Sequence, residues 1–372
     1  NKIYYIDNNN IDFNKLVGLN IWTYDAKKLD VILFKNNINN VNICEDVMIL
    51  GYLLNYNVKD DIAYLANDMG CNIAYYDRKR ANTFEELMDN CAKKVKFIND
   101  TVSLFKDKIL KEDMDKLYYE IELPLARVLA KMEYTGIICD KDKLSDMGCE
   151  INKRLNVIQD EIYSLAGCEF NINSPKQLGE VLFDKMKLPY AKKNKSGYST
   201  DVSILGKLSD YEIVTKVLEY RMLSKLYSTY IEGLINSISD DGRIHTIYTQ
   251  TLTRTGRLSS IEPNLQNIPT RLELGKQLRK VFRPKEGYIY IDADYSQIEL
   301  RVLAHISKDE NMMQAFINDE DIHKQAASKV LGIPIDEVTK EQRSSAKAVN
   351  FGIVYGISEF GLAEQLGITR KA

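Results

Sequence analysis

Residues 292–301 read Asp-Ala-Asp-Tyr-Ser-Gln-Ile-Glu-Leu-Arg and follow the apolar run Tyr288-Ile-Tyr-Ile. This order predicts a strand over 288–293 that ends on acidic residues. Because side chains alternate along a strand, Asp292 and Asp294 would point the same way. A carboxylate at such a strand end suits Mg²⁺, which takes its remaining ligands from phosphates and water. The residues alone leave open that the acids only cap a helix beginning near Ser296.

The helix expected after this strand has one apolar side. Its residues on the buried side would mostly be Ile298, Leu300, Val302, Leu303 and Ile306. Glu299 falls near the strand end. It is either an exposed acid paired with an arginine such as Arg301 or Arg279, or a wall against the sugar of a nucleotide. Spacing alone does not choose between these interpretations.

Residues 343–356 read Arg-Ser-Ser-Ala-Lys-Ala-Val-Asn-Phe-Gly-Ile-Val-Tyr-Gly. On a helix, Arg343, Lys347, Phe351 and Tyr355 form one stripe ~18 Å long. The cations suit a triphosphate and the rings suit stacking on a base. A surface helix with an aromatic edge on the core is the alternative. Two glycines in this stretch, Gly352 and Gly356, each cost ~1 kcal/mol of helix stability relative to alanine. Their presence would be explained if another surface, such as a template base, comes close to the helix here.

A polar turn lies upstream of these motifs. It includes Thr253-Arg-Thr-Gly-Arg-Leu-Ser-Ser and Asn264-Leu-Gln-Asn, which are rich in donors and poor in core formers. Arg254, Arg257, Asn264, Gln266 and Asn267 could reach phosphates or the minor-groove acceptors of a duplex. An ordinary surface loop is the alternative.

The composition is that of an ordinary water-soluble protein. The 372 residues favour two or three domains, and the net charge of −3 means that a nucleic-acid site must concentrate positive charge locally. Six cysteines without a C-x-x-C pair, together with three histidines, argue against a zinc site. No run of ~18 apolar residues exists, so we expect no membrane span.

The first ~113 residues predict a small α/β region. Its expected helices lie around Asp30–Phe34, Val47–Leu54, Asp60–Ala66 and Phe84–Leu110, and its expected strands at Lys2–Ile6 and Leu19–Trp22. Further helices are predicted at 117–135, 141–167 and 210–233 and from 311 onward, and further strands at 136–139 and within 243–252. Ser174 is expected to cap a helix that begins at Pro175.

Taken together, these motifs resemble those of the family A DNA polymerases, collinearly from about Leu117 to Ala372. Residues 292–307 resemble motif A, residues 343–356 resemble motif B on the fingers helix, and residues 254–271 resemble the segment that contacts the minor groove and primer. The resemblance implies an α+β multidomain fold, an incomplete right-hand polymerase preceded by a partial 3′–5′ exonuclease-like α/β domain. It places that domain at 1–113 and the polymerase domain at 114–372, with the thumb at about 140–240, the palm at about 241–308 and the fingers from about 309.

The resemblance assigns the catalytic roles. Asp294 matches the metal-binding aspartate, with the carbonyl of Tyr295 as a further ligand, and Asp292 has no counterpart. Arg343 and Lys347 match the cations that act with Asp294 on the triphosphate, and two Mg²⁺ ions are implied. The family's second catalytic aspartate lies in a His-Asp-Glu motif beyond Ala372. We therefore expect the chain alone to bind metal poorly and not to polymerise.

The resemblance also assigns contacts to nucleotide and DNA. The implied dNTP-binding residues are Gln297, Glu299, His323, Arg343, Lys347, Phe351 and Tyr355. Among them Glu299 would exclude ribonucleotides at the sugar 2′ position, and phenylalanine at 351 implies poor use of dideoxynucleotides. His323 would contact a phosphate, although the residues alone make it a surface side chain. The implied DNA-binding residues are Arg254, Arg257, Asn264, Gln266, Asn267 and Tyr355.

Residues 1–113 resemble the later part of the exonuclease-like domain. Asp25 sits where that domain has one carboxylate. The paired Asp-x-Glu is not in these residues, and Cys91-Ala-Lys-Lys-Val replaces the late Tyr-x-x-x-Asp motif. We therefore expect no proofreading.

These expectations describe a DNA-templated DNA polymerase that adds dNTPs to a primer 3′ end in replication and repair. Its partners would be primer-template DNA and dNTPs, and we expect a monomer in the bacterial cytoplasm, at the nucleoid, without a membrane. A related single-subunit RNA polymerase is one alternative, which Glu299 disfavours. The other is a DNA-binding remnant without catalysis, which Asp294, Arg343 and Lys347 disfavour.

Overall fold

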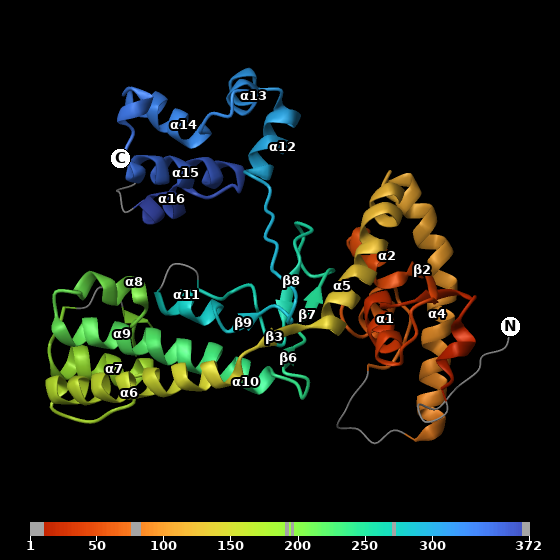
Figure 1. Ribbon diagram of the computed structural model, residues 1–372, viewed down its shortest axis with the longest axis horizontal. Helices are drawn as coiled ribbons and strands as arrows, with labels where there is room; N and C mark the ends of the chain where they lie inside the picture. The colour runs from red at the N-terminus through yellow and green to blue at the C-terminus, as the bar shows by residue number, and fades with distance from the viewer. Residues whose placement is uncertain (1–10, 76–82, 190–192, 195–196, 270–272, 367–372) are drawn as a thin grey trace. The chain divides into compact units, whose positions relative to one another are not determined.

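The computed structural model describes residues 11–75, 83–189, 193–194, 197–269 and 273–366. The chain divides into two compact units, Asn1–Ile289 and Tyr290–Ala372. The described strands all lie in the first unit, and the described elements of the second are helices joined by turns (Figure 1). No helix in the described part of the chain is long and apolar enough to cross a membrane.

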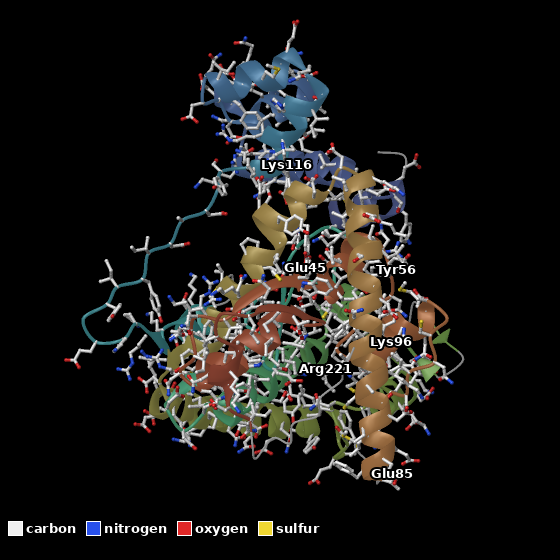
Figure 2. The ribbon with its side chains drawn as sticks, turned by 90° about the vertical axis from the view of Figure 1, so that its right-hand side faces the viewer. Glu45, Tyr56, Glu85, Lys96, Lys116 and Arg221 are labelled. Carbon is white, nitrogen blue, oxygen red and sulfur yellow. The ribbon has the colours of Figure 1, made fainter. Side chains whose placement is uncertain are left out.

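The first region of unit 1 is a parallel β–α–β arrangement covered by helices. Its elements are β1 (Asn20–Thr23), α1 (Ala26–Lys35), β2 (Asn42–Asp46), α2 (Val47–Leu53), α3 (Ala63–Asp68) and α4 (Phe84–Lys111). Strands β1 and β2 pair in parallel, with α1 between them in sequence. Asp25 and Asp46 cap α1 and α2 by accepting from backbone amides, which fixes where each helix begins. Glu85 and Lys96 lie along α4, the long orange helix of Figure 2.

Most predictions for this region are confirmed. The four predicted helices correspond to α1–α4, and the strand predicted at Leu19–Trp22 corresponds to β1. The strand predicted at Lys2–Ile6 lies outside the described residues. Strand β2 was not predicted because its buried residues are acids: Glu45 binds Lys106 Nζ at 2.6 Å, and Asp46 accepts backbone hydrogen bonds.

A helix and a small sheet follow in unit 1. Helix α5 (Leu123–Thr135) follows a π-helical turn at Leu117–Glu122. Pro124 stands in the first turn of α5, directly after this π-helical turn. The chain then forms β3 (Ile137–Cys139), which lies between β6 (Arg243–Ile244) and β9 (Phe282–Arg283) in an antiparallel sheet. The region predicted as one strand at 243–252 holds two, β6 and β7 (Ile247–Thr249), and β7 pairs with β8 (Ser259–Ile261).

A helical lobe occupies the span predicted for the thumb. Its main helices are α6 (Lys141–Ala166), α7 (Pro175–Gly179), α8 (Val202–Leu205), α9 (Glu212–Leu226) and α10 (Gly233–Ser237), and α11 (Glu273–Arg279) packs nearby through Leu278. A two-stranded hairpin, β4 (Lys193–Asn194) and β5 (Gly197–Tyr198), lies between α7 and α8. Ser174 caps α7 by accepting from the amide of Gln177, as predicted. Ile158, Ile162, Leu178, Leu182 and Val217 are fully buried in the common core.

The described part of the second unit contains five α-helices and a 3₁₀ helix at Ile335–Glu337. The α-helices are α12 (Ile298–Ser307), α13 (Glu310–Ile317), α14 (Ile322–Leu331), α15 (Lys340–Val354) and α16 (Glu359–Leu366). The prediction of helices from residue 311 onward is confirmed. Helices α14 and α15 pack against each other, as do α12 and α13.

The strand predicted over 288–293 is not formed. Residues 288–294 belong to no helix or strand, and Ile289 and Ile291 are 81% and 86% exposed. A strand requires a neighbour that completes its backbone hydrogen bonds. None of the described residues provides such a neighbour for this segment, so its apolar sequence alone does not produce a strand.

The predicted buried side of α12 is also partly wrong. Leu300 and Ala304 are buried, but Ile298, Val302 and Ile306 are 44%, 47% and 72% exposed. Among the described elements, α13 packs against α12, so a narrow part of the α12 surface is covered. Arg301 is turned toward α13, with its guanidinium carbon 4.7 Å from the centre of the Phe316 ring.

Replacement of Glu133 tests how much the contacts of α5 with α1 and β7 contribute to the stability of unit 1. One oxygen of this buried carboxylate accepts from Lys27 Nζ at 2.6 Å and from the amide of Tyr248 at 2.8 Å. Glu133→Ala leaves a lysine charge and an amide unpaired, so we expect the free energy of unfolding to fall by ~3 kcal/mol in urea denaturation. Asp89→Ala, which removes an exposed partner of Lys93, should cost less than ~1 kcal/mol. Equal effects would contradict the role assigned to Glu133.

Candidate functional site

The predicted stripe on α15 is present. Lys347 Nζ lies 5.8 Å from the centre of the Phe351 ring, and the Phe351 and Tyr355 rings are stacked at 6.0 Å with an angle of 11°. Arg343 stands two turns before Phe351 on the same helix. The helix ends at Val354, so Tyr355 is carried by the turn that follows. This arrangement offers two cations and a pair of parallel rings along one side of the second unit.

The chain itself explains why glycine stands at 352 and at 356, for a different reason at each position. A Cβ on Gly352 would lie 2.6 Å from Ile357 Cγ2, so the surface that approaches this glycine is the chain itself. Gly356 has φ of 67°, in the left-handed region that favours glycine after a helix. The template base suggested by the sequence is therefore not needed to explain either residue.

Asp321, which the sequence did not single out, joins α14 to α15. Its carboxylate accepts from the amides of His323 and Lys324 at 3.0 and 3.1 Å, which caps α14. Its other oxygen accepts from Arg343 Nε at 2.5 Å. Burial acts to raise the pKa of Asp321, but the hydrogen bond from Arg343 and the two backbone donors outweigh it and lower the pKa below its ordinary value. Asp321 therefore carries a full negative charge that holds the Arg343 guanidinium.

His323 is buried between the two helices, so the surface position expected from the residues alone is wrong. The side chain is 1% exposed, and its ring centre lies 5.6 Å from that of Phe351. Asn350 Nδ2 lies 3.1 Å from Nδ1, whereas buried Nε2 has no hydrogen-bond partner among the described residues. Burial lowers the pKa of His323; Asp321 opposes this, and Arg343 and Lys347 reinforce it. The imidazole is therefore neutral at neutral pH.

The acidic segment before α12 is accessible. Asp292, Asp294 and Tyr295 are exposed. The cap position of α12 is Gln297, with φ of 52° and no side-chain cap bond, so the acids do not cap this helix.

The carboxamide oxygen of Gln297 is buried without a partner in the described structure. Glu299 is half-buried in the first turn of α12. In the described part of the chain, no three His, Cys, Asp or Glu side chains gather as a metal-binding group.

The polar turn forms an exposed surface of unit 1. Its members Arg254, Arg257, Asn264, Gln266 and Asn267 are all exposed. The turn is held by its own hydrogen bonds: Thr253 Oγ1 donates to the Arg257 carbonyl at 2.7 Å, and Asn264 Oδ1 accepts from the Gln266 amide at 3.0 Å. The five side chains are therefore accessible, as a nucleic-acid contact requires, although the Gln266 carboxamide also donates to the Leu258 carbonyl at 3.4 Å.

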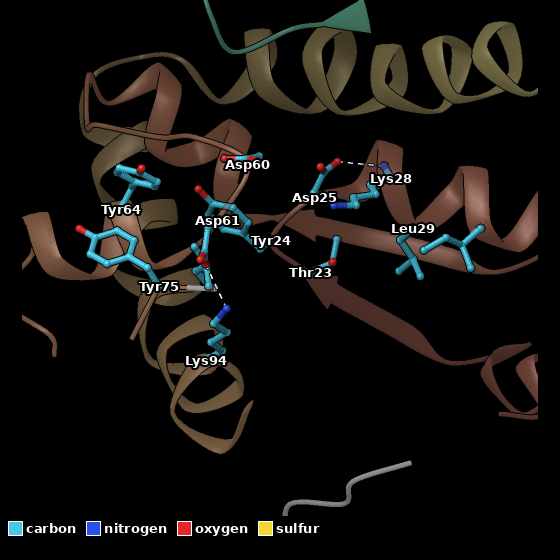
Figure 3. A pocket seen from close by; sticks show the side chains of 12 residues that line it. Thr23, Tyr24, Asp25, Lys28, Leu29, Asp60, Asp61, Tyr64, Tyr75 and Lys94 are labelled. Atoms are coloured by element: carbon cyan, nitrogen blue, oxygen red, sulfur yellow. Dashed lines mark hydrogen bonds and ion pairs between the residues drawn. The ribbon is translucent and has the colours of Figure 1, made fainter. Parts of the chain in front are cut away.

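A cavity of about 740 Å³ lies beside Asp25 in the first region of unit 1 (Figure 3). Acidic, basic and tyrosine side chains line it, among them Asp60, Asp61, Lys94 and Tyr64. Asp25 caps α1 there, and Lys94 Nζ lies 3.0 Å from Asp61 Oδ1. Lys94 belongs to the stretch Cys91-Ala-Lys-Lys-Val, so a lysine of that stretch enters the cavity and neutralises one of its carboxylates.

Comparison with known proteins defines the class to which these features belong. Residues 141–372 match the model of DNA polymerase family A, and the chain belongs to that family. It is 47% identical over 365 residues to the DNA polymerase I of Lactococcus lactis subsp. cremoris and 46% identical over 362 residues to that of Bacillus subtilis. Each alignment covers 94% of this chain and 41% of the relative, so the chain spans about two fifths of their length.

A solved structure agrees with this assignment. The POL domain of Pol1 from M. smegmatis, in complex with DNA primer-template and dNTP, superimposes with a TM-score of 0.81 at 35% identity. The match covers 94% of this chain and 60% of that one. The α+β polymerase fold expected from the sequence is thus confirmed, whereas the roles of individual site residues stay predictions.

Two substitutions of Asp321 separate its cap from its ion pair. Asp321→Asn keeps a capping oxygen and loses the charge, whereas Asp321→Ala loses both, so alanine should cost ~1 kcal/mol more in urea unfolding.

The lowered pKa of Asp321 means that its charge stabilises the fold fully above the unfolded-state pKa of ~4 and ceases to do so as the pH falls through the folded-state pKa. The stability difference between wild type and Asp321→Asn should therefore be constant above about pH 5 and shrink as the pH falls below ~4. A difference that grows on acidification would contradict the ion pair.

Proposed function

We propose that this chain is the part of a DNA-templated DNA polymerase that holds the incoming dNTP, and that the complete protein adds nucleotides to a primer 3′ end. The observation that carries the proposal is the α14–α15 pair, on which Arg343, Lys347, buried His323 and the stacked rings of Phe351 and Tyr355 gather. The related POL domain, solved in complex with DNA primer-template and dNTP, supports the choice of ligand.

Each group on these helices suits a different part of a nucleotide. The Arg343 guanidinium offers a planar set of donors to phosphate oxygens, and the Lys347 ammonium offers a compact charge. The neutral His323 ring has a buried nitrogen, Nε2, that has no hydrogen-bond partner among the described residues and suits a further oxygen. Phe351 and Tyr355 present parallel faces for the sugar, the base or the template. Binding a triphosphate in this way contributes positioning and charge stabilisation to nucleotidyl transfer.

Residues of the acidic segment fit a divalent cation. The exposed Asp294 carboxylate and the Tyr295 carbonyl are hard oxygen donors of the kind that Mg²⁺ prefers. When bound, two Mg²⁺ ions would supply positive charge to the attacking primer hydroxyl and to the leaving pyrophosphate. Asp294 is the residue of this chain that we propose holds such an ion.

Primer extension by the complete polymerase that carries this sequence tests the assignment of Asp294. Asp294→Asn should lower the rate by at least ~100-fold, because a neutral amide cannot replace a carboxylate ligand of the metal. Asp292→Asn is the matched control, two residues away and likewise exposed, and it should retain most of the activity. If Asp294→Asn extends primers as well as the wild type, the metal assignment is wrong.

Glu299 is proposed to exclude ribonucleotides by blocking the sugar 2′ position. Glu299→Ala should lower the ratio of kcat/KM for dNTP over rNTP by about tenfold or more, since it opens space for a hydroxyl. Glu299→Gln keeps the size of the side chain and should keep most of the discrimination. Unchanged discrimination in the alanine variant would remove Glu299 from this role and reopen the possibility of an RNA polymerase.

We also propose that the first region of unit 1 does not remove nucleotides from primer ends. Asp25 is a capping residue at the cavity, and Lys94 pairs with Asp61 there, which leaves a mixed charge rather than a group of free carboxylates. The measurement is release of nucleotides from the 3′ end of single-stranded DNA by the complete protein in the presence of Mg²⁺. Release that Asp25→Ala abolishes would contradict the proposal.

A further inference from the structure

We propose that Asn350 is a positioning residue that fixes the tautomer of His323 and so presents its Nε2–H to an oxygen of the bound nucleotide. The inference rests on the proposed function for its ligand. The part that concerns Asn350 and His323 depends only on contacts within the second unit.

The contact between the two side chains determines where the imidazole proton sits. Asn350 Nδ2 lies 3.1 Å from His323 Nδ1. An amide nitrogen donates and does not accept, so Nδ1 must supply a lone pair to this hydrogen bond. A neutral imidazole with an unprotonated Nδ1 carries its proton on Nε2.

The surroundings of His323 keep the ring neutral. The residue is 1% exposed, and burial disfavours a charged imidazolium. The charged groups that act on it are Arg343 and Lys347 of α15, which also disfavour protonation, and Asp321 at the start of α14, which favours it. The carboxylate of Asp321 is itself held by Arg343, so its influence on the ring is partly offset.

The remaining nitrogen is therefore a buried N–H donor. Nε2 has no hydrogen-bond partner among the described residues. An unsatisfied buried donor is unfavourable unless a ligand atom completes its bond. The cations Arg343 and Lys347 near the ring favour an anionic acceptor, and a phosphate oxygen has both the charge and the lone pairs. A donor on Nε2 adds a directional contact that a flexible lysine does not provide.

Asn350 acts in this scheme without touching the nucleotide. It selects one of two tautomers, and the other tautomer would present a lone pair on Nε2 to a negatively charged oxygen. Its position on α15, one turn after Lys347 and next to Phe351, couples the ring to the helix that carries the other proposed contacts.

Nitrogen NMR of the histidines tests the tautomer in the 372-residue chain without any nucleotide. The chain has three histidines, so ¹⁵N-histidine labelling gives three ring systems, and His245 and His305 serve as internal references. We expect His323 to show a protonated Nε2 and an unprotonated Nδ1. In Asn350→Asp, whose carboxylate can only accept, we expect the proton to move to Nδ1, while the other two rings keep their signals. A proton on Nδ1 in the wild type, or no change in Asn350→Asp, overturns the proposal.

Kinetics of the complete polymerase test the consequence for the nucleotide. Asn350→Leu, which can neither donate nor accept, should raise KM for the dNTP about tenfold with a much smaller effect on kcat, the order expected for one hydrogen bond to a charged oxygen. In a His323→Phe background the same substitution should add less than about twofold, because Asn350 acts through the histidine. A residue with a merely structural role would change KM equally in both backgrounds, and that result overturns the proposal.

The two assays separate the possible failures. If the wild-type polymerase does not extend primers, the proposed function fails whatever the tautomer. If it extends primers and His323 has the expected tautomer, but His323→Phe leaves KM unchanged, the nucleotide contact is wrong and the proposal falls while the polymerase function stands.

Discussion

The packing of α14 against α15 depends on two polar contacts that join residues far apart in the sequence. Asp321 binds Arg343 across 22 residues, and His323 binds Asn350 across 27 residues. Both contacts start at the N-terminal end of α14, from its cap residue Asp321 and from His323, and reach two separate turns of α15. Because each involves a buried or partly buried group, loss of one partner would leave the other unsatisfied. The contacts therefore fix the side chains as well as the helices.

This arrangement gathers positive charge locally in a chain whose net charge is slightly negative. The net charge is −3, yet Arg343 and Lys347 stand on the helix that carries the stacked rings Phe351 and Tyr355. Asp321 balances one of the cations, and the adjacent histidine is neutral, so the site is not a simple accumulation of charge. Local fields of this kind can attract an anionic ligand without a basic protein surface.

The sequence predicted the local structure well and the tertiary structure less well. Helical spacing found α15 and its stripe, and the Ser174-Pro175 pair found the start of α7, because these depend on neighbours within one or two turns. The strand over 288–293 was wrong and the buried side of α12 was partly wrong, since pairing and burial are decided by segments that the pattern does not contain. Asp321 and Asn350 were missed for the same reason, although the helix-start position of Asp321 is visible in Asp-Ile-His-Lys. The residues alone offered a metal role for Asp294 and a place beside the sugar for Glu299 without deciding either, whereas the role of His323 came from the resemblance alone.

The central claim is that the α14–α15 face binds the triphosphate of an incoming nucleotide. A crystal structure of the complete polymerase with primer-template DNA and a dNTP, trapped with a primer that lacks its 3′ hydroxyl, tests it most directly. We expect phosphate oxygens at about 3 Å from Arg343, from Lys347 Nζ and from His323 Nε2. A triphosphate bound elsewhere, with these three groups still turned toward Asp321 and Asn350 or toward solvent, would contradict the claim.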